Sequence, residues 1–236
     1  MNVKAILLDI EGTTTPIDFV HKTLFPYARE RMPEFVRENF GKIQDEIASL
    51  QAEHKLDREK GENPAPFDPL SAESIAEYLI HLIERDRKST ALKSIQGQIW
   101  RAGYESGELR GEVFDDVLPA FERWTRAGKT IAIFSSGSRL AQRLIFGFSV
   151  AGDLTRFISA YFDTTTGAKK NSESYRKIAA DLNLEPGEIL FVSDVLGELD
   201  AAFEAGMQTR LAIRPNNPPT NEATMHQTIN SFDELE

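Results

Sequence analysis

The sequence predicts an α/β protein with a doubly wound parallel sheet, interrupted after its first strand by a helical insertion. Two observations carry this prediction. From residue 115 onward, short apolar segments alternate with helical ones, which is the pattern of a parallel sheet with helices on both faces. A further apolar segment, at residues 4–8, is separated from that series by a long polar, helix-like stretch without a strand pattern. We therefore expect the core to consist of two pieces of chain.

The first strand is expected at Lys4–Leu8, because a continuous apolar run is typical of a strand covered on both faces. The insertion contains the helical segments "FPYARERMPEFVRENF", "SAESIAEYLIHLIERD" and "TALKSIQGQIWRAGYESG", and the proline-rich loop "GENPAPFDPL". We expect residues 1–18 and 110–236 to form the α/β core and residues 19–109 to form a helical cap domain. Both ends of the insertion lie near the carboxyl end of the first strand, where a lid over an active site would attach.

The second part of the core contains four predicted strands and the helices between them. The strands lie in "TIAIFSSGS", "ISAYFDT", "EILFVSD" and "TRLAIRP". The helices lie in "VLPAFERWTRAG", at Arg139–Phe146, in "SESYRKIAADLNL" and in "ELDAAFEAG", and a loop-like "PNNPPT" follows the last strand. In open parallel sheets, ligands bind at the carboxyl ends of the strands.

Composition and charge narrow the class of protein. The 236 residues carry a net charge of −10, which argues against a nucleic-acid binder, because such proteins neutralise phosphates with basic patches. No apolar run is long enough to span a bilayer, and the start "MNVKAILLDIEG" does not read as a signal peptide. The lack of cysteine excludes disulfides and thiolate metal sites, and the 4 histidines have no zinc-ligand spacing. We expect a cytoplasmic protein without a membrane or nucleic-acid partner.

Polar side chains follow the carboxyl ends of four of the predicted strands. In chain order they are Asp9 and Glu11, Ser135 and Ser136, Lys169 and Lys170, and Asp194 with Glu198 one turn later. Each group alone is ordinary: an acidic turn, a serine cap, solvated lysines or a helix N-cap. Because the carboxyl ends of parallel strands meet at one edge of a sheet, we expect these side chains to form one catalytic site.

The residue types in this set suit phosphoryl transfer. Carboxylate oxygens are the hard ligands that Mg²⁺ prefers, and the cation relieves the repulsion between clustered carboxylates. An aspartate can accept a phosphoryl group as a nucleophile, while hydroxyl, backbone N–H and lysine groups hold phosphate oxygens. Glu11, two positions after Asp9, has the reach to protonate a leaving oxygen and later to activate water.

The same motifs resemble a known family. "DIEGTT", "FSSGS", the lysine segment "GAKK" and "FVSD", in this order, resemble the haloacid dehalogenase superfamily of phosphohydrolases. Longer segments, among them "DIEGTTTPIDFVHKTLFPYA" and "GYESGELRGEVFDDVLPAFERW", are similar to the enolase-phosphatases of methionine salvage, also called acireductone synthases. The resemblance runs through the whole chain, and it implies the superfamily's α/β core with a helical cap.

The resemblance implies roles for the residues that match its motifs. They are Asp9 as nucleophile and magnesium ligand, Glu11 as acid–base group and part of the metal site, Ser135 and Ser136 as phosphate-binding residues, Lys169 as the motif lysine, and Asp194 as the third metal carboxylate. The superfamily more often has Asp where Glu11 stands, whereas the enolase-phosphatase pattern has Glu. Lys170 is the alternative to Lys169. Glu198 is a candidate for a supporting role, because the residue after Asp194 is Val195 rather than an acid.

The resemblance further implies a substrate, two reactions and one Mg²⁺ per subunit. The substrate is 2,3-diketo-5-methylthiopentyl-1-phosphate, which is enolised and then hydrolysed to the acireductone 1,2-dihydroxy-3-keto-5-methylthiopentene and phosphate. Three alternatives stay open: the same machinery acting on another small phosphate ester, a phospho-accepting signalling module of the flavodoxin-like kind, and a non-catalytic binding protein. The signalling module would carry its acceptor on a later strand and would lack the insertion. The resemblance suggests a monomer.

Overall fold

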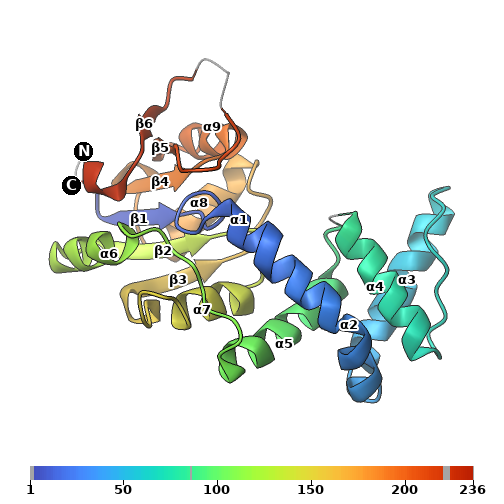
Figure 1. Cartoon of the computed structure of the whole chain (residues 1–236). Helices are drawn as coiled ribbons and strands as arrows, with labels where there is room; N and C mark the ends of the chain where they lie inside the picture. The colour runs from blue at the N-terminus through green and yellow to red at the C-terminus, as the bar shows by residue number, and fades with distance from the viewer. Residues whose placement is uncertain (1–2, 86, 220–223, 236) are drawn as a thin grey trace. The chain divides into compact units, whose positions relative to one another are not determined.

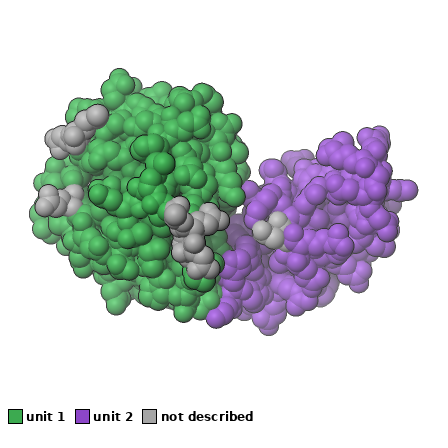
Figure 2. Space-filling model, turned by 90° about the horizontal axis from the view of Figure 1, so that it is seen from above, with its two compact units in different colours: residues 1–20, 110–236 green, residues 21–109 purple. Residues whose placement is uncertain are grey.

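The computed structural model describes residues 3–85, 87–219 and 224–235. The chain divides into two compact units, residues 1–20 with 110–236 and residues 21–109 (Figure 2). The first unit contains the sheet, and the second is helical (Figure 1). Among the described residues, no helix has both the length and the apolar character needed to cross a membrane.

The sheet of the first unit has, within the described ranges, six parallel strands in the order β3-β2-β1-β4-β5-β6. In chain order they are β1 (Ala5–Leu8), β2 (Thr130–Phe134), β3 (Ile158–Phe162), β4 (Ile189–Ser193), β5 (Gln208–Ala212) and β6 (Gln227–Ile229). β1 lies between β2 and β4, so that Leu8 pairs with Ile133 on one side and Val192 on the other. The strand order reverses at β1, and the ligand crevice of a doubly wound sheet lies at such a reversal.

Helices cover both faces of this sheet (Figure 1). On one face lie α6 (Val117–Arg126) and α7 (Arg139–Gly147), and on the other α8 (Ser172–Asp181) and α9 (Leu196–Glu204). Because successive side chains of a strand point to opposite faces, β1 contributes Ala5 and Leu7 to the core under α8 and α9. Tyr175 of α8 packs there against Phe134 and Phe191. This burial on both faces explains the continuous apolar run of β1.

The second unit is built from helices. They are α2 (Phe25–Asn39), α3 (Gln44–Glu59), α4 (Ala72–Glu84) and α5 (Thr90–Ser106), preceded by a π-helical segment at Val20–Leu24 that begins at the end of the first unit. Serine caps start two of them: Ser71 Oγ accepts from Ser74 N–H and Ser89 Oγ from Leu92 N–H, each at 3.2 Å. The proline-rich loop between α3 and α4 packs Phe67 against ring side chains of both helices.

The predicted fold class is confirmed, and the sheet has one strand more than expected. The additional strand is β6, three residues long with two of them exposed, so it lacks the apolar run that marks the other strands. Short helical turns complete the chain: α1 (Ile17–Phe19) and the 3₁₀ turns Thr155–Phe157, Pro186–Glu188 and Phe232–Glu234. The residues of the second unit that the structure describes contain no strand, as the polar helical texture indicates.

Candidate active site at the carboxyl edge of the sheet

The two central strands end in aspartates at the same edge of the sheet. Asp9 follows β1, and its N–H donates to Val192 O at 3.0 Å, which extends the pairing of β1 with β4 by one residue. Asp194 follows Ser193, the last residue of β4. Asp9 is 4% exposed, whereas Asp194 is only partly buried. The topology therefore brings two carboxyl groups to the point where the strand order reverses.

A buried network joins Asp9 to Lys169 and Glu198. The Lys169 ammonium lies 2.7 Å from Asp9 Oδ1 and 2.6 Å from Glu198 Oε2. The Ser193 hydroxyl lies within hydrogen-bond reach of the same two carboxylates, 3.2 Å from Asp9 Oδ2 and 3.0 Å from Glu198 Oε2. Ser193 Oγ also accepts a hydrogen bond from Val195 N–H at 3.2 Å. These four side chains are buried, so their contacts are shielded from water.

Negative charge exceeds positive charge in this network. Asp9, Glu198 and Asp194 are three carboxyl groups near one ammonium. Burial alone would lower the pKa of Lys169, but the carboxylates of Asp9 and Glu198 outweigh burial and raise it, so Lys169 stays protonated. Burial, and after it the charges of Asp9 and Glu198, raises the pKa of Asp194 to about 7. Burial likewise raises the pKa of Glu198. A surplus of buried carboxylates suits a bound cation.

The turn after β1 approaches Asp194 closely at Gly12. Gly12 has a φ of +68°, a left-handed conformation that glycine adopts at little cost. A Cβ at this position would lie 2.3 Å from Asp194 Oδ2 and 3.0 Å from Asn217 Oδ1. Glycine is therefore required here both by the backbone conformation and by the lack of space.

Local hydrogen bonds hold the same turn in place. The Thr14 hydroxyl donates to the carbonyl oxygens of Asp9 and Ile10, with 3.2 Å to each. Ile10 N–H in turn donates to Asp9 Oδ1 at 2.7 Å, which orients the carboxylate. Glu11 lies in this turn, partly buried, and its backbone forms an isolated β-bridge with Thr15.

The turn after β2 carries the predicted serine segment. Ser135 is partly buried, and its Oγ accepts from Gly137 N–H at 3.2 Å, whereas Ser136 is exposed. Ser138 caps α7, with Oγ accepting from Ala141 N–H at 3.3 Å. Gln142 of α7 fastens the turn by donating to Gly137 O at 2.9 Å. The turn thus presents its hydroxyl groups at a helix N-terminus, which favours anions.

Helix α8 positions the loop that carries the two lysines. Tyr175 Oη donates to Lys169 O at 2.6 Å, and Ser174 Oγ donates to Ala168 O at 2.7 Å. Lys170 is exposed, and the stem of its side chain runs beside Gly197 at the start of α9. Of the two adjacent lysines, Lys169 is the one that contacts Asp9 and Glu198.

Sequence reasoning missed one member of the network. The segment "EILFVSD" predicts a strand but no role for Ser193, which contacts both Asp9 and Glu198. A small polar residue at the end of an otherwise apolar, fully buried strand was the available signal. Glu198, expected only in a supporting role, contacts Lys169 directly.

The oxygens at this edge fit a magnesium ion. Among the described residues, no three acidic or histidine side chains are arranged to hold a metal between them. Mg²⁺ does not need such a cage, because it is usually held by one or two carboxylates, substrate oxygens and water. Asp9 and Asp194 would supply the carboxylates, and the nearby Asn217 Oδ1 is buried without a hydrogen-bond partner in the described part of the chain. The metal-ligand roles of Asp9, Glu11 and Asp194 stay predictions.

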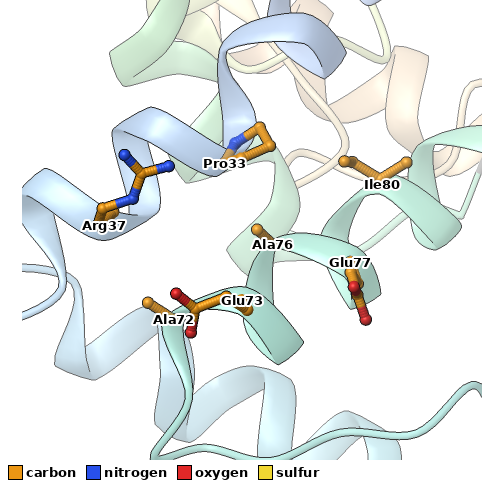
Figure 3. A pocket seen from close by; sticks show the side chains of 7 residues that line it. All are labelled: Pro33, Arg37, Ala72, Glu73, Ala76, Glu77 and Ile80. Carbon is orange, nitrogen blue, oxygen red and sulfur yellow. The ribbon is translucent and has the colours of Figure 1, made fainter.

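A separate pocket lies within the second unit, between α2 and α4 (Figure 3). Its lining consists of Pro33, Arg37, Ala72, Glu73, Ala76, Glu77 and Ile80. Its volume is 170 Å³, which is below the roughly 300–1,000 Å³ of typical small-molecule sites. We therefore assign the candidate active site to the edge of the sheet.

The fold and the site together define a haloacid dehalogenase-like hydrolase. A sequence model of the haloacid dehalogenase-like hydrolase family matches residues 3–206. Among solved structures, the UTR4 protein of Saccharomyces cerevisiae superposes with a TM-score of 0.82 at 33% identity, over 99% of this chain and 100% of that one. CbbY from Rhodobacter sphaeroides shares the fold, with a TM-score of 0.59 at 16% identity over 99% of this chain and 96% of that one.

Relatives with higher sequence identity show which family of haloacid dehalogenase-like hydrolases the chain belongs to. Enolase-phosphatase E1 of Synechococcus elongatus is 51% identical over 100% of this chain and 98% of its own length. Enolase-phosphatase E1 of Sorangium cellulosum is 45% identical over 98% of this chain and 97% of its own length. A Populus trichocarpa protein named probable bifunctional methylthioribulose-1-phosphate dehydratase/enolase-phosphatase E1 is 45% identical over 98% of this chain and 47% of its own length. The chain belongs to the enolase-phosphatase E1 family, and it is a hydrolase.

Proposed function

We propose that this chain is a magnesium-dependent enolase-phosphatase, the acireductone synthase of methionine salvage. It converts 2,3-diketo-5-methylthiopentyl-1-phosphate, through its enol phosphate, to 1,2-dihydroxy-3-keto-5-methylthiopentene and phosphate. The observation that carries the proposal is the buried ion pair of Asp9 and Lys169 at the carboxyl end of β1, with 2.7 Å between Asp9 Oδ1 and the ammonium. Two more carboxyl groups, those of Asp194 and Glu198, lie close to this pair. The substrate follows from the relatives named Enolase-phosphatase E1.

Asp9 is the nucleophile of the phosphatase step. A carboxylate oxygen of Asp9 bonds to phosphorus while the bond between phosphorus and the ester oxygen on C1 of the enol phosphate breaks, and Glu11 donates its proton to that departing oxygen. Water then attacks the phosphoaspartyl phosphorus, Glu11 takes up the water proton, and phosphate leaves with Asp9 regenerated. Asp9 Oδ1 has two contacts of 2.7 Å, and Oδ2 has a longer one of 3.2 Å to Ser193. Oδ2 is therefore the more weakly held oxygen.

Lys169 acts as a fixed positive charge. Its ammonium contacts the carboxylates of both Asp9 and Glu198, which hold it in place. It orients Asp9 and stabilises negative charge on the transferring phosphoryl group. Ser135 and Ser136 bind phosphate oxygens at the start of α7. Asp9, Glu11 and Asp194 would hold Mg²⁺, which would supply Lewis-acid polarisation of the diketone and of the phosphate.

The helical insertion, residues 19–109, is proposed as the cap that selects the substrate. It enters the chain after β1 and ends before β2, the two strands that carry Asp9 and the serine segment. The methylthio end of the substrate is apolar, so its recognition needs apolar side chains in addition to the polar edge of the sheet. We propose a monomer that acts on this small phosphate ester.

A paired assay tests the proposal. The diketone phosphate is incubated with the chain with and without Mg²⁺, and enol absorbance and released phosphate are followed in the same cuvette. An enol signal that precedes phosphate, with both requiring Mg²⁺, supports the proposal. Phosphate release from simpler esters without reaction on the diketone would favour a phosphatase for another small ester. A lack of turnover of every phosphate ester tested would refute the proposed function.

A further inference from the structure

The loop after β5, Arg214–Asn217, has no part in the mechanism above, yet it contacts the turn that follows Asp9. Arg214 Nε donates to Thr13 O at 3.0 Å. Asn217 Nδ2 donates to Gly12 O at 2.8 Å. Two side chains of one loop thus hold two successive carbonyl groups of the turn next to the nucleophile.

Arg214 fixes this loop from within the protein. Its guanidinium carbon lies over the rings of Phe114 and Phe232, 4.6 and 4.5 Å from their centroids. The same group contacts Asp116 Oδ2 at 2.7 Å, and Arg214 is 6% exposed. Asn217 N–H donates back to Arg214 O at 3.2 Å, which closes the loop. The position of Asn217 therefore depends on the buried Arg214.

The amide oxygen of Asn217 lacks a partner. Oδ1 is buried and has no hydrogen-bond partner among the residues that the structure describes. Since Nδ2 already donates to Gly12 O, the amide cannot turn over without losing that bond. A buried polar atom left unpaired is costly, and it points to a partner outside the chain.

The neighbour of this oxygen is Asp194. Asn217 Oδ1 and Asp194 Oδ2 lie 3.0 and 2.3 Å from the same point, the position that a Cβ on Gly12 would take. The Gly12 turn is thus flanked by the Asp194 carboxyl group and by the unpaired amide oxygen of Asn217. The carboxylates of Asp9 and Glu198 lie near Asp194 as well. Both are hard oxygens of the kind that Mg²⁺ accepts.

We infer that Asn217 Oδ1 is a further oxygen ligand of the cation site formed with Asp194, acting directly or through water. The inference rests on the proposed function in one respect, that a divalent cation binds at Asp9 and Asp194. A neutral amide adds an oxygen to this site without adding another negative charge. Asn217 has a second role through Nδ2, because it holds the Gly12 turn against which Asp194 lies.

The test measures Mn²⁺ binding to the whole chain without substrate, from the electron paramagnetic resonance signal of the free ion. Mn²⁺ replaces Mg²⁺ because carboxylate and carbonyl oxygens suit both. Asn217→Ala should weaken Mn²⁺ binding by about 10-fold or more, as loss of a group around a metal typically does. Asn217→Asp keeps an oxygen at this position but loses the donor to Gly12 O, and it should bind Mn²⁺ at least as tightly as the wild type.

Asn216→Gly is the matched control. Asn216 is exposed, has a φ of 67° and contacts Asp18, so glycine keeps its backbone conformation and leaves Asn217 in place. Its Mn²⁺ affinity should equal that of the wild type. Thermal unfolding followed by circular dichroism without metal verifies that each variant is folded before the affinities are compared.

Two results would overturn the inference. Unchanged Mn²⁺ binding in Asn217→Ala would exclude a ligand role. Equal weakening in Asn217→Ala and Asn217→Asp would assign the whole effect to the hydrogen bond with Gly12 O. In both cases the wild type still binds Mn²⁺ and turns over the diketone phosphate, whereas failure of the proposed function appears as a wild-type chain without that turnover.

Discussion

Replacing Gly12 by alanine should damage the active site more than it damages the fold. At a φ of +68° an alanine costs about 1–2 kcal/mol, because its Cβ crowds the following carbonyl oxygen. The new Cβ would also lie 2.3 Å from Asp194 Oδ2, whereas ordinary contact begins at 3.4 Å. The Asp194 carboxylate must then move by about 1 Å, a displacement that at a reacting centre costs on the order of 100-fold in rate.

Gly128→Ala separates the two effects. Gly128 has a φ of +73°, but a Cβ there would meet nothing within 4 Å, so the substitution carries the backbone cost alone. Urea unfolding should show a loss of about 1–2 kcal/mol in Gly128→Ala and a loss at least as large in Gly12→Ala. Phosphate release should fall by about 100-fold in kcat/KM only in Gly12→Ala. If Gly12→Ala kept a kcat/KM within a few-fold of Gly128→Ala, the close approach of Asp194 would not matter for catalysis, and the reasoning would be wrong.

Three further substitutions test the buried network and its surroundings. Asp9→Asn should abolish phosphate release while urea unfolding shows a folded chain, and retained turnover would exclude Asp9 as the nucleophile. Lys169→Met should lower the free energy of unfolding by about 3–5 kcal/mol, because it leaves the buried carboxylates of Asp9 and Glu198 without the ammonium group that pairs with them. An unfolding curve like that of the wild type would contradict this. Hydrogen bonds from Thr165, together with Arg139, lower the pKa of Asp163 although burial opposes them. Its contribution to stability is therefore present above its unfolded pKa of about 3.9 and lost as the pH falls through the lower folded value. In acid urea unfolding, the advantage of the wild type over Asp163→Asn should shrink from about pH 4 downward, and a constant difference would refute this cause.

The edge of the sheet could be predicted from sequence because its signals are local. β1 is a continuous apolar run and β4 is apolar up to Ser193, and the residue after each strand is an aspartate. Parallel strands place such residues at one edge whatever the details of packing, so Asp9 and Asp194 could be assigned to a common place from their positions alone. The same logic applies to the serine segment after β2.

The contacts between distant residues could not be predicted in this way. Arg214 and Asn217 bond to the carbonyl oxygens of Thr13 and Gly12, and a backbone acceptor leaves no mark in the sequence. "PNNPPT" therefore indicates only a loop. β6 was missed for a related reason, since a three-residue strand with two exposed side chains has no apolar pattern to detect.

The network around Lys169 explains how a strand can end in a buried carboxylate. Burying the Asp9 carboxylate without a partner would be costly. A cation that contacted Asp9 alone would compensate most of its charge. Here the Lys169 ammonium is shared, 2.7 Å from Asp9 and 2.6 Å from Glu198. Because the ammonium also contacts Glu198, it compensates the charge of Asp9 only in part. The same ammonium lowers the free-energy cost of burying both carboxylates. The carboxylate at the end of β1 is thereby stabilised enough to be buried without an ion pair of its own, as the proposed nucleophile role requires.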